Sequence, residues 1–186
     1  MNIIELVQKN LGFNALEKID PNTMETAGPG NPMGNNALSQ AGIPAILLGI
    51  YTKLEQNPMS DLLVNDQPGS LLERIFGKST EVVVERITAY SQIKDKHRVQ
   101  ELEHIASECL RVIKEKIGLG GGETAIRHFV AGNKPDILLY LPPSLDLGTI
   151  LQNNNLDDRT GKMEGPISSL MHRVEKTFNT SAEVKN

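Results

Sequence analysis

Residues 96–117 constrain the fold more than any other stretch of this sequence. Apolar residues recur there at the three- and four-residue spacing that places side chains on one face of an α-helix. The apolar positions are Val99, Leu102, Ile105, Ala106, Cys109, Leu110, Val112 and Ile113. A helix with so wide an apolar face has to bury it against other elements. We therefore expect a long helix at the centre of the fold.

Residues 44–56 form a second constraining segment, because apolar side chains cover most of its circumference. A helix that is apolar all round is a buried one, so we expect the other helices to pack around it. Pro44 suits the first turn of this helix, and Asn57 with Pro58 ends it. Its most apolar part, residues 43–51, has about half of the ~18 residues that a membrane-spanning helix needs. No membrane association is expected.

Shorter helical patterns fill most of the remaining chain. Ser79 is the expected N-cap of one of them. The β-branched valines at 82–84 leave a strand open there, but the spacing of Val83, Ile87 and Tyr90 favours a helix. The segments expected to be helical are residues 3–11, 62–64, 71–76, 79–90, 124–130, 144–152 and 166–178.

The overall pattern predicts an all-α fold, a compact multi-helical single domain over residues 1–180. It contains no run of alternating strands and no internal repeat. Residues 20–36 hold Pro, Gly and Asn without helical spacing, so we expect a flexible loop. Residues 181–186 are expected to be a disordered tail.

Charge and cysteine content exclude some classes of function. The chain has 186 residues, a formal net charge of −4 and one cysteine, Cys109. A chain of net negative charge has no general attraction for nucleic acid or anionic lipid, and a single cysteine cannot form an internal disulfide. Residues 1–20 contain no continuous apolar stretch of the kind that a secretory signal needs. We expect a cytoplasmic protein.

Residues 71–118 read LLERIFGKSTEVVVERITAYSQIKDKHRVQELEHIASECLRVIKEKIG, and residues 43–51 read IPAILLGIY. The first stretch resembles the core of the YidB-like bacterial family, which is named as a domain of unknown function, and the second resembles the apolar helix of that family. Gln92 stands where family members tend to carry a glycine. The resemblance implies a multi-helical fold with a helix-turn-helix or homeodomain-like element, and it implies no active-site residue.

The turn before the long helix is locally positive. A helix ending at residue 89 or 90, a turn, and a helix starting near Asp95 would form a helix-turn-helix corner. The side chains that would then meet the phosphates and base edges of DNA are Lys94, Lys96, His97, Arg98 and Gln100. Glu101, Glu103 and Glu108 follow on the next turns and would repel phosphate. DNA recognition and a simple packing corner both stay open, and the acidic residues favour the packing corner.

A line of histidine and glutamate side chains runs along the same helix. Steps of four, three and four residues align His97, Glu101, His104 and Glu108. A Glu-x-x-His pair supplies ligands in di-metal bundles, where it faces the core. This line lies far from the apolar face, so we expect solvated side chains with local His–Glu pairs. No metal or other cofactor is expected, and these four residues are the candidates that a bound metal would use.

Asp157, Asp158 and Arg159 form the densest polar cluster in the second half of the chain. Such a cluster could hold a cation or do acid–base work, but adjacent Asp residues in a loop more often cap the next helix. The glycine run at residues 118–122 lacks the Lys-Ser/Thr of a P-loop and is expected to end a helix. Cys109 belongs to an apolar face, where a thiol is inert. No catalytic residue is assigned.

These observations favour a non-enzymatic helical interaction or scaffold protein of YidB-like type. Such a protein would bind a protein partner or a second copy of itself. The alternative is a weak DNA-binding protein that uses residues 94–100, although the charge disfavours nucleic acid as a partner. A third possibility is a small enzyme or metal-binding protein, with its site at residues 157–159 or along the His–Glu line.

Overall fold

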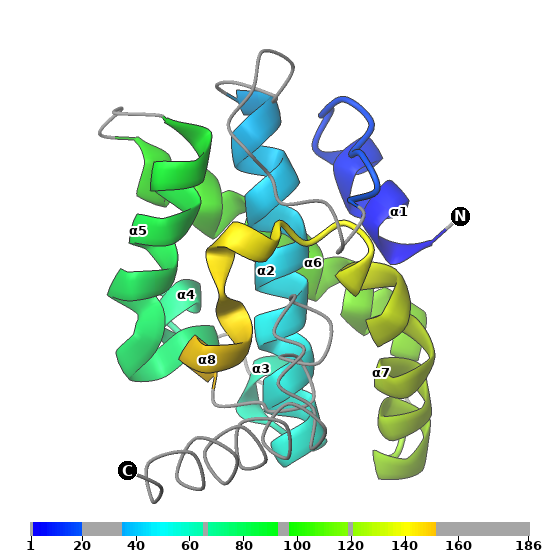
Figure 1. The fold of residues 1–186 in the computed structure, drawn as a ribbon. Coiled ribbons are helices and arrows are strands. Elements are labelled where there is room, and N and C mark those ends of the chain that lie inside the picture. The colour runs from blue at the N-terminus through cyan, green and yellow to red at the C-terminus, as the bar shows by residue number, and fades with distance from the viewer. Residues whose placement is uncertain (1, 20–34, 65–66, 93–96, 119–120, 152–186) are drawn as a thin grey trace, which may run out of the picture.

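The computed structural model describes residues 2–19, 35–64, 67–92, 97–118 and 121–151. All regular elements in these ranges are helical and none is a strand, which confirms the predicted all-α fold (Figure 1). The α-helices are α1 (Ile3–Asn10), α2 (Asn35–Gln56), α3 (Asp61–Val64), α4 (Leu71–Phe76), α5 (Thr80–Ser91), α6 (Arg98–Ile117), α7 (Glu123–Leu138) and α8 (Leu147–Leu151). Two 3₁₀ turns, η1 (Gly77–Ser79) and η2 (Pro143–Leu145), precede α5 and α8. None of these helices combines the length and the apolar composition that crossing a membrane requires.

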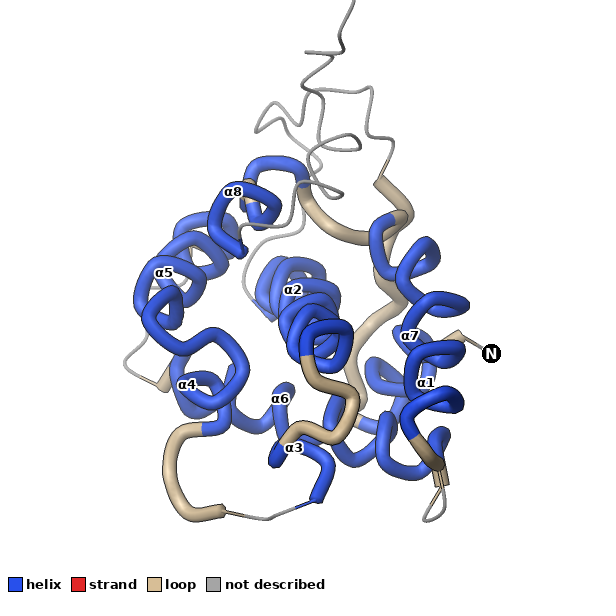
Figure 2. The backbone as a smooth tube through the Cα atoms, turned by 90° about the horizontal axis from the view of Figure 1, so that it is seen from below, coloured by secondary structure: helices blue, strands red, loops and turns tan. Residues whose placement is uncertain are grey.

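Helix α2 is the centre of the fold, as its apolar composition predicts. Every residue from 37 to 52 is buried. The helix contacts α1, α4, α5, α6, α7 and α8. Figure 2 shows α4, α5 and α8 on one side of it and α1 and α7 on the other. The apolar circumference of α2 is therefore covered by several helices at once.

The predicted start of this helix is wrong. Pro44 lies inside α2, which already begins at Asn35. A proline within a helix removes one hydrogen bond and costs about 3 kcal/mol. The segment before Pro44 nevertheless stays helical because Leu38, Ala41 and Ile43 on it are buried in the core, and burial of one large apolar side chain contributes about 1.5–3 kcal/mol.

Two glycines let neighbouring helices approach α2 closely. A Cβ on Gly49 would lie 2.4 Å from Cε1 of Phe76, at the end of α4. A Cβ on Gly42 would lie 3.0 Å from Cδ2 of Leu102 on α6. Gly49 thus sets how closely α4 packs against α2, because an aromatic ring occupies the space that any other side chain would need.

Helix α6 confirms the long helix expected from periodicity. Seven of its eight predicted apolar positions are buried, and Val99 is the exception, with 44% of its surface exposed. Val99 lies in the first turn of α6 and faces a groove rather than another helix. The end of α6 is also as expected, because Gly118 follows it with a positive φ of 75°.

Helix α7 is longer than predicted. It runs through Pro135 to Leu138, where the sequence suggested a helix ending near Val130. Pro135 removes the hydrogen bond to the carbonyl of Ala131, but both residues are exposed, so water can reach that carbonyl.

The expected helix over residues 144–152 is also wrong in part. Asp146, with φ of 47°, separates η2 from α8.

Helix α5 confirms the helical interpretation of the valine-rich segment. Ser79, its expected N-cap, makes no capping hydrogen bond with its side chain, because η1 leads directly into the helix. The Ser79 hydroxyl instead lies 3.5 Å from the Ile150 carbonyl oxygen on α8.

Several predicted segments lie outside the described residues: residues 20–34 of the predicted loop, the tail, and the predicted helix over 166–178. The last two residues of the predicted loop, 35 and 36, begin α2.

Candidate functional site

The predicted DNA-reading residues are only partly within the described chain. Lys94 and Lys96 lie outside it. His97 and Gln100 are exposed, and Arg98 is half-buried. His97 Nδ1 lies 3.0 Å from Gln100 Oε1, so these two side chains contact each other. Arg98 faces a groove that α6 shares with α4 and α5.

The His–Glu line is not a cluster of ligands. His97 and His104 are exposed, whereas Glu101 and Glu108 are half-buried. In the described part of the chain, no three His, Cys, Asp or Glu side chains come together as a metal ion would require. Glu108, which was expected to be solvated, is only 13% exposed and contacts another helix.

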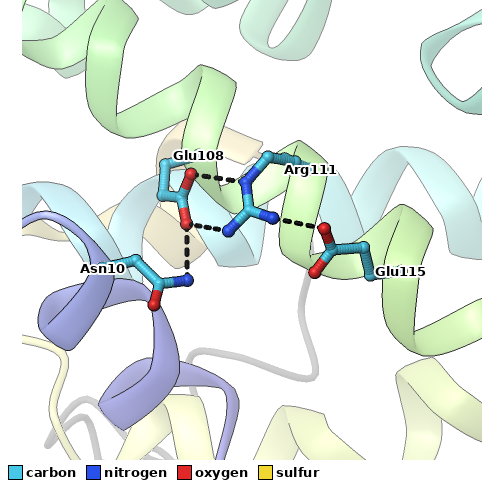
Figure 3. A network of polar contacts seen from close by, with 4 residues as sticks. All are labelled: Asn10, Glu108, Arg111 and Glu115. Atoms are coloured by element: carbon cyan, nitrogen blue, oxygen red, sulfur yellow. Dashed lines mark hydrogen bonds and ion pairs between the residues drawn. The ribbon is translucent and has the colours of Figure 1, made fainter.

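Glu108 is the centre of a polar network that ties α1 to α6 (Figure 3). Its Oε1 accepts hydrogen bonds from Asn10 Nδ2 at 2.7 Å and from Arg111 Nη2 at 2.6 Å, and its Oε2 accepts one from Arg111 Nε at 2.8 Å. Arg111 also pairs with Glu115. The bidentate Arg111 guanidinium holds the pKa of Glu108 below its ordinary value. This arrangement makes Glu108 a structural residue.

Glu103 also has a structural role that its sequence position did not indicate. Its Oε1 accepts a hydrogen bond from the Ser70 hydroxyl at 2.5 Å, and its Oε2 accepts one from the Leu71 backbone N–H at 2.9 Å. The first N–H groups of a helix have no partner within the helix, and they carry partial positive charge. Glu103 therefore caps α4 from a distant helix and holds it against α6.

Helices α4, α5 and α6 line an open groove of about 1530 Å³. Helix α5 contributes one entire face to it, at helical spacing. The residues of that face are Thr80, Glu81, Val84, Glu85, Thr88 and Ala89, and Gln92, the C-cap residue after α5, also lines the groove. The opposite face of α5 holds Val83 and Ile87, which are buried in the core. The rest of the lining comes from the start of α4, from η1 and from α6: Ser70, Leu72, Glu73, Gly77, Lys78, Arg98, Val99 and Glu103.

Carboxylates outnumber cations in this groove. Glu73, Glu81 and Glu85 are exposed, and their carboxylates have no hydrogen bond or ion pair with any described residue. The cationic side chains of the lining are Lys78 and Arg98. Val99 adds an exposed apolar side chain. The groove thus combines a negative surface with an apolar contact point.

Glu73, Glu81 and Glu85 were not among the site residues predicted from the sequence. A signal for two of them was present, because Glu81 and Glu85 are one turn apart on a helix whose other face is apolar. No pattern within the sequence shows that α4 and α6 line a groove together with that face. The groove depends on contacts between segments far apart in the chain.

The other chemically reactive groups lie away from the groove. Burial raises the pKa of the Cys109 thiol, which is fully buried, and also that of the Tyr51 hydroxyl. Asp157, Asp158 and Arg159 lie outside the described residues. A smaller apolar hollow of about 300 Å³ lies between α3 and the end of α6, lined by residues such as Met59, Leu63 and Ile117. Neither the thiol nor the phenol reaches solvent.

Comparison with known proteins adds no constraint on this groove. No family model, no curated protein and no solved structure matches the chain.

Proposed function

We propose that this chain is a non-enzymatic helical interaction protein that docks a segment of another protein in the groove of α4, α5 and α6. The observation that carries the proposal is the face of α5 that lines the groove from Thr80 to Ala89, on which Glu81, Glu85 and Ala89 are exposed. Exposed faces of this kind, with an apolar contact inside a polar rim, are typical of interaction sites.

The charge of the groove supports a protein segment over DNA. Duplex DNA binds through phosphate contacts with Lys and Arg. The described lining of the groove instead holds more carboxylates than cations, and its cationic residues are Lys78 and Arg98. Weak duplex binding by residues 94–100 is the competing function. It would use the helix-turn-helix element that the resemblance of residues 43–118 to the YidB-like family implies.

An unbiased selection tests the proposal. The full chain is immobilised and offered a displayed library of helical and of extended peptides. We expect a recurring set of binding peptides. When each is added to the labelled protein, the changes in the backbone amide chemical shifts of the protein, measured by NMR, should concentrate at the groove. Val99→Asp should abolish their binding, whereas Met59→Asp, at another exposed apolar residue, should not.

Two results would contradict the proposal. The first is a selection that yields no recurring binder, or binders that map to another surface. The second is binding of random duplex DNA that falls steeply with added salt and is lost when Arg98 becomes Glu, because this would indicate counterion release at the predicted corner.

A further inference from the structure

The shape of the groove decides which form of peptide fits it. Strand addition needs an exposed sheet edge, and the described part of the chain has no strand. Recognition of a proline-rich segment needs a groove lined with aromatic rings, and no aromatic residue is among the described lining residues. The remaining common mode is a helix laid in a groove between helices. All three walls here are helical, so their side chains form ridges that interlock with those of another helix.

The charge pattern of α5 decides which residues that helix should carry. Glu81 and Glu85 are four residues apart, so both lie on the same line of the helix surface, with their Cβ atoms about 5–6 Å apart. Like charges at this spacing repel each other. Neither carboxylate forms an ion pair with a described residue. A helix with two cationic side chains one turn apart would pair with both.

The apolar contact lies across the groove from this pair. Val99 belongs to α6, and it is 44% exposed although its helical register predicts burial. Val84 on α5 is half-buried in the same groove. An apolar side chain on the incoming helix, flanked by the two cations, would cover these valines. Burial of apolar surface would then supply affinity, and the ion pairs would supply register.

From these observations we infer that the groove selects an amphipathic helix of a partner protein that carries two Lys or Arg residues at positions i and i+4 around an apolar anchor. The inference rests on the proposed function, because it names the partner chemistry of the same groove. Arg98 and Lys78 in the lining add selectivity, since they would repel a helix that is basic along its whole length.

The test uses the full chain and the helical library of the selection above, with charge reversal in the groove. Binders selected by the natural protein should be enriched in Lys or Arg pairs at i and i+4. The variant Glu81→Lys/Glu85→Lys should lose at least tenfold in affinity for the tightest of these binders. Changing the paired cations of that peptide to Glu should recover binding to the variant. Fluorescence anisotropy of the labelled peptides measures both the loss of affinity and its recovery.

Matched controls separate a specific effect from a general one. Glu17→Lys/Asp136→Lys makes the same change of net charge at exposed carboxylates outside the groove, and it should alter affinity less than twofold. Glu81→Gln/Glu85→Gln removes the charges without reversing them and should give an intermediate loss. Circular dichroism melting curves show whether each variant is folded.

The possible failures have different meanings. Binders that map to the groove but lack basic pairs would overturn the inference and leave the proposed function standing. Equal losses in the groove variant and in the control variant would also overturn it, because they would show attraction by net charge alone. An absence of binders would remove both the inference and the function on which it rests.

Discussion

The Ser70 hydroxyl at the start of α4 donates a hydrogen bond of 2.5 Å to Glu103 Oε1 on α6. The same carboxylate accepts the Leu71 backbone N–H. One side chain thus joins the two helices that flank the groove opposite α5. The position of α4, and with it the width of the groove, depends on this contact between distant parts of the sequence.

Removing the Glu103 carboxylate should destabilise the fold. Glu103→Ala leaves N–H groups at the start of α4 without their acceptor in a half-buried place, and we expect a loss of about 1–3 kcal/mol in the free energy of unfolding. Urea denaturation followed by circular dichroism measures it. Glu101→Ala, on the same helix, should change the value by less than about 0.5 kcal/mol. Similar losses for the two variants would show that Glu103 is not a cap.

Two glycine substitutions should act in opposite directions. In Gly49→Ala the new methyl group would lie 2.4 Å from the Phe76 ring, so we expect a loss of about 1–3 kcal/mol from overpacking between α2 and α4. Gly132→Ala meets no atom within 4 Å on α7 and should stabilise by up to about 1 kcal/mol, because alanine is the better helix former. Thermal melting of the two variants compares them directly. A stabilised Gly49→Ala protein would mean that α4 can move away from α2 at no cost.

The Glu108–Arg111 pair should make stability depend on pH in the acid range. The folded state lowers the pKa of Glu108, chiefly through the Arg111 hydrogen bonds. The ionised Glu108 side chain therefore makes its full contribution to the free energy of unfolding above its pKa in the unfolded chain, about 4.3. This contribution is lost as the pH falls through the lower pKa of Glu108 in the folded protein. Glu108→Gln should flatten this part of the curve of unfolding free energy against pH. Denaturation midpoints between neutral and strongly acid pH measure the difference, and parallel curves for the two proteins would contradict it.

Cys109 should be unreactive in the folded protein. Its thiol is fully buried, and burial raises its pKa, so little thiolate is present at neutral pH. We expect alkylation by iodoacetamide to be slow in native buffer and complete in denaturant, as mass spectrometry would show. Rapid labelling of the native chain would indicate that α6 separates from α2 under native conditions.

The sequence by itself determined the class of the fold and its two main helices. The apolar spacing of residues 96–117 predicted α6, and the apolar circumference of residues 44–56 predicted a central α2. Such predictions succeed because helix formation and amphipathicity depend on residues three or four positions apart. Local rules failed at Pro44 and Pro135, where burial and solvent access outweighed the cost of a proline.

The candidate site was decided only by the tertiary structure. The sequence predicted Val99 in the core and Glu108 in solvent. Val99 instead faces a groove, and the half-buried Glu108 accepts a hydrogen bond from Asn10 on α1. Local spacing shows which face of a helix is apolar, but not which helix covers it or where its covering ends. Which helix covers a face depends on how closely distant segments of the chain can approach each other, as the helices that carry Gly49 and Phe76 do. The separation of such segments along the chain follows no periodic pattern.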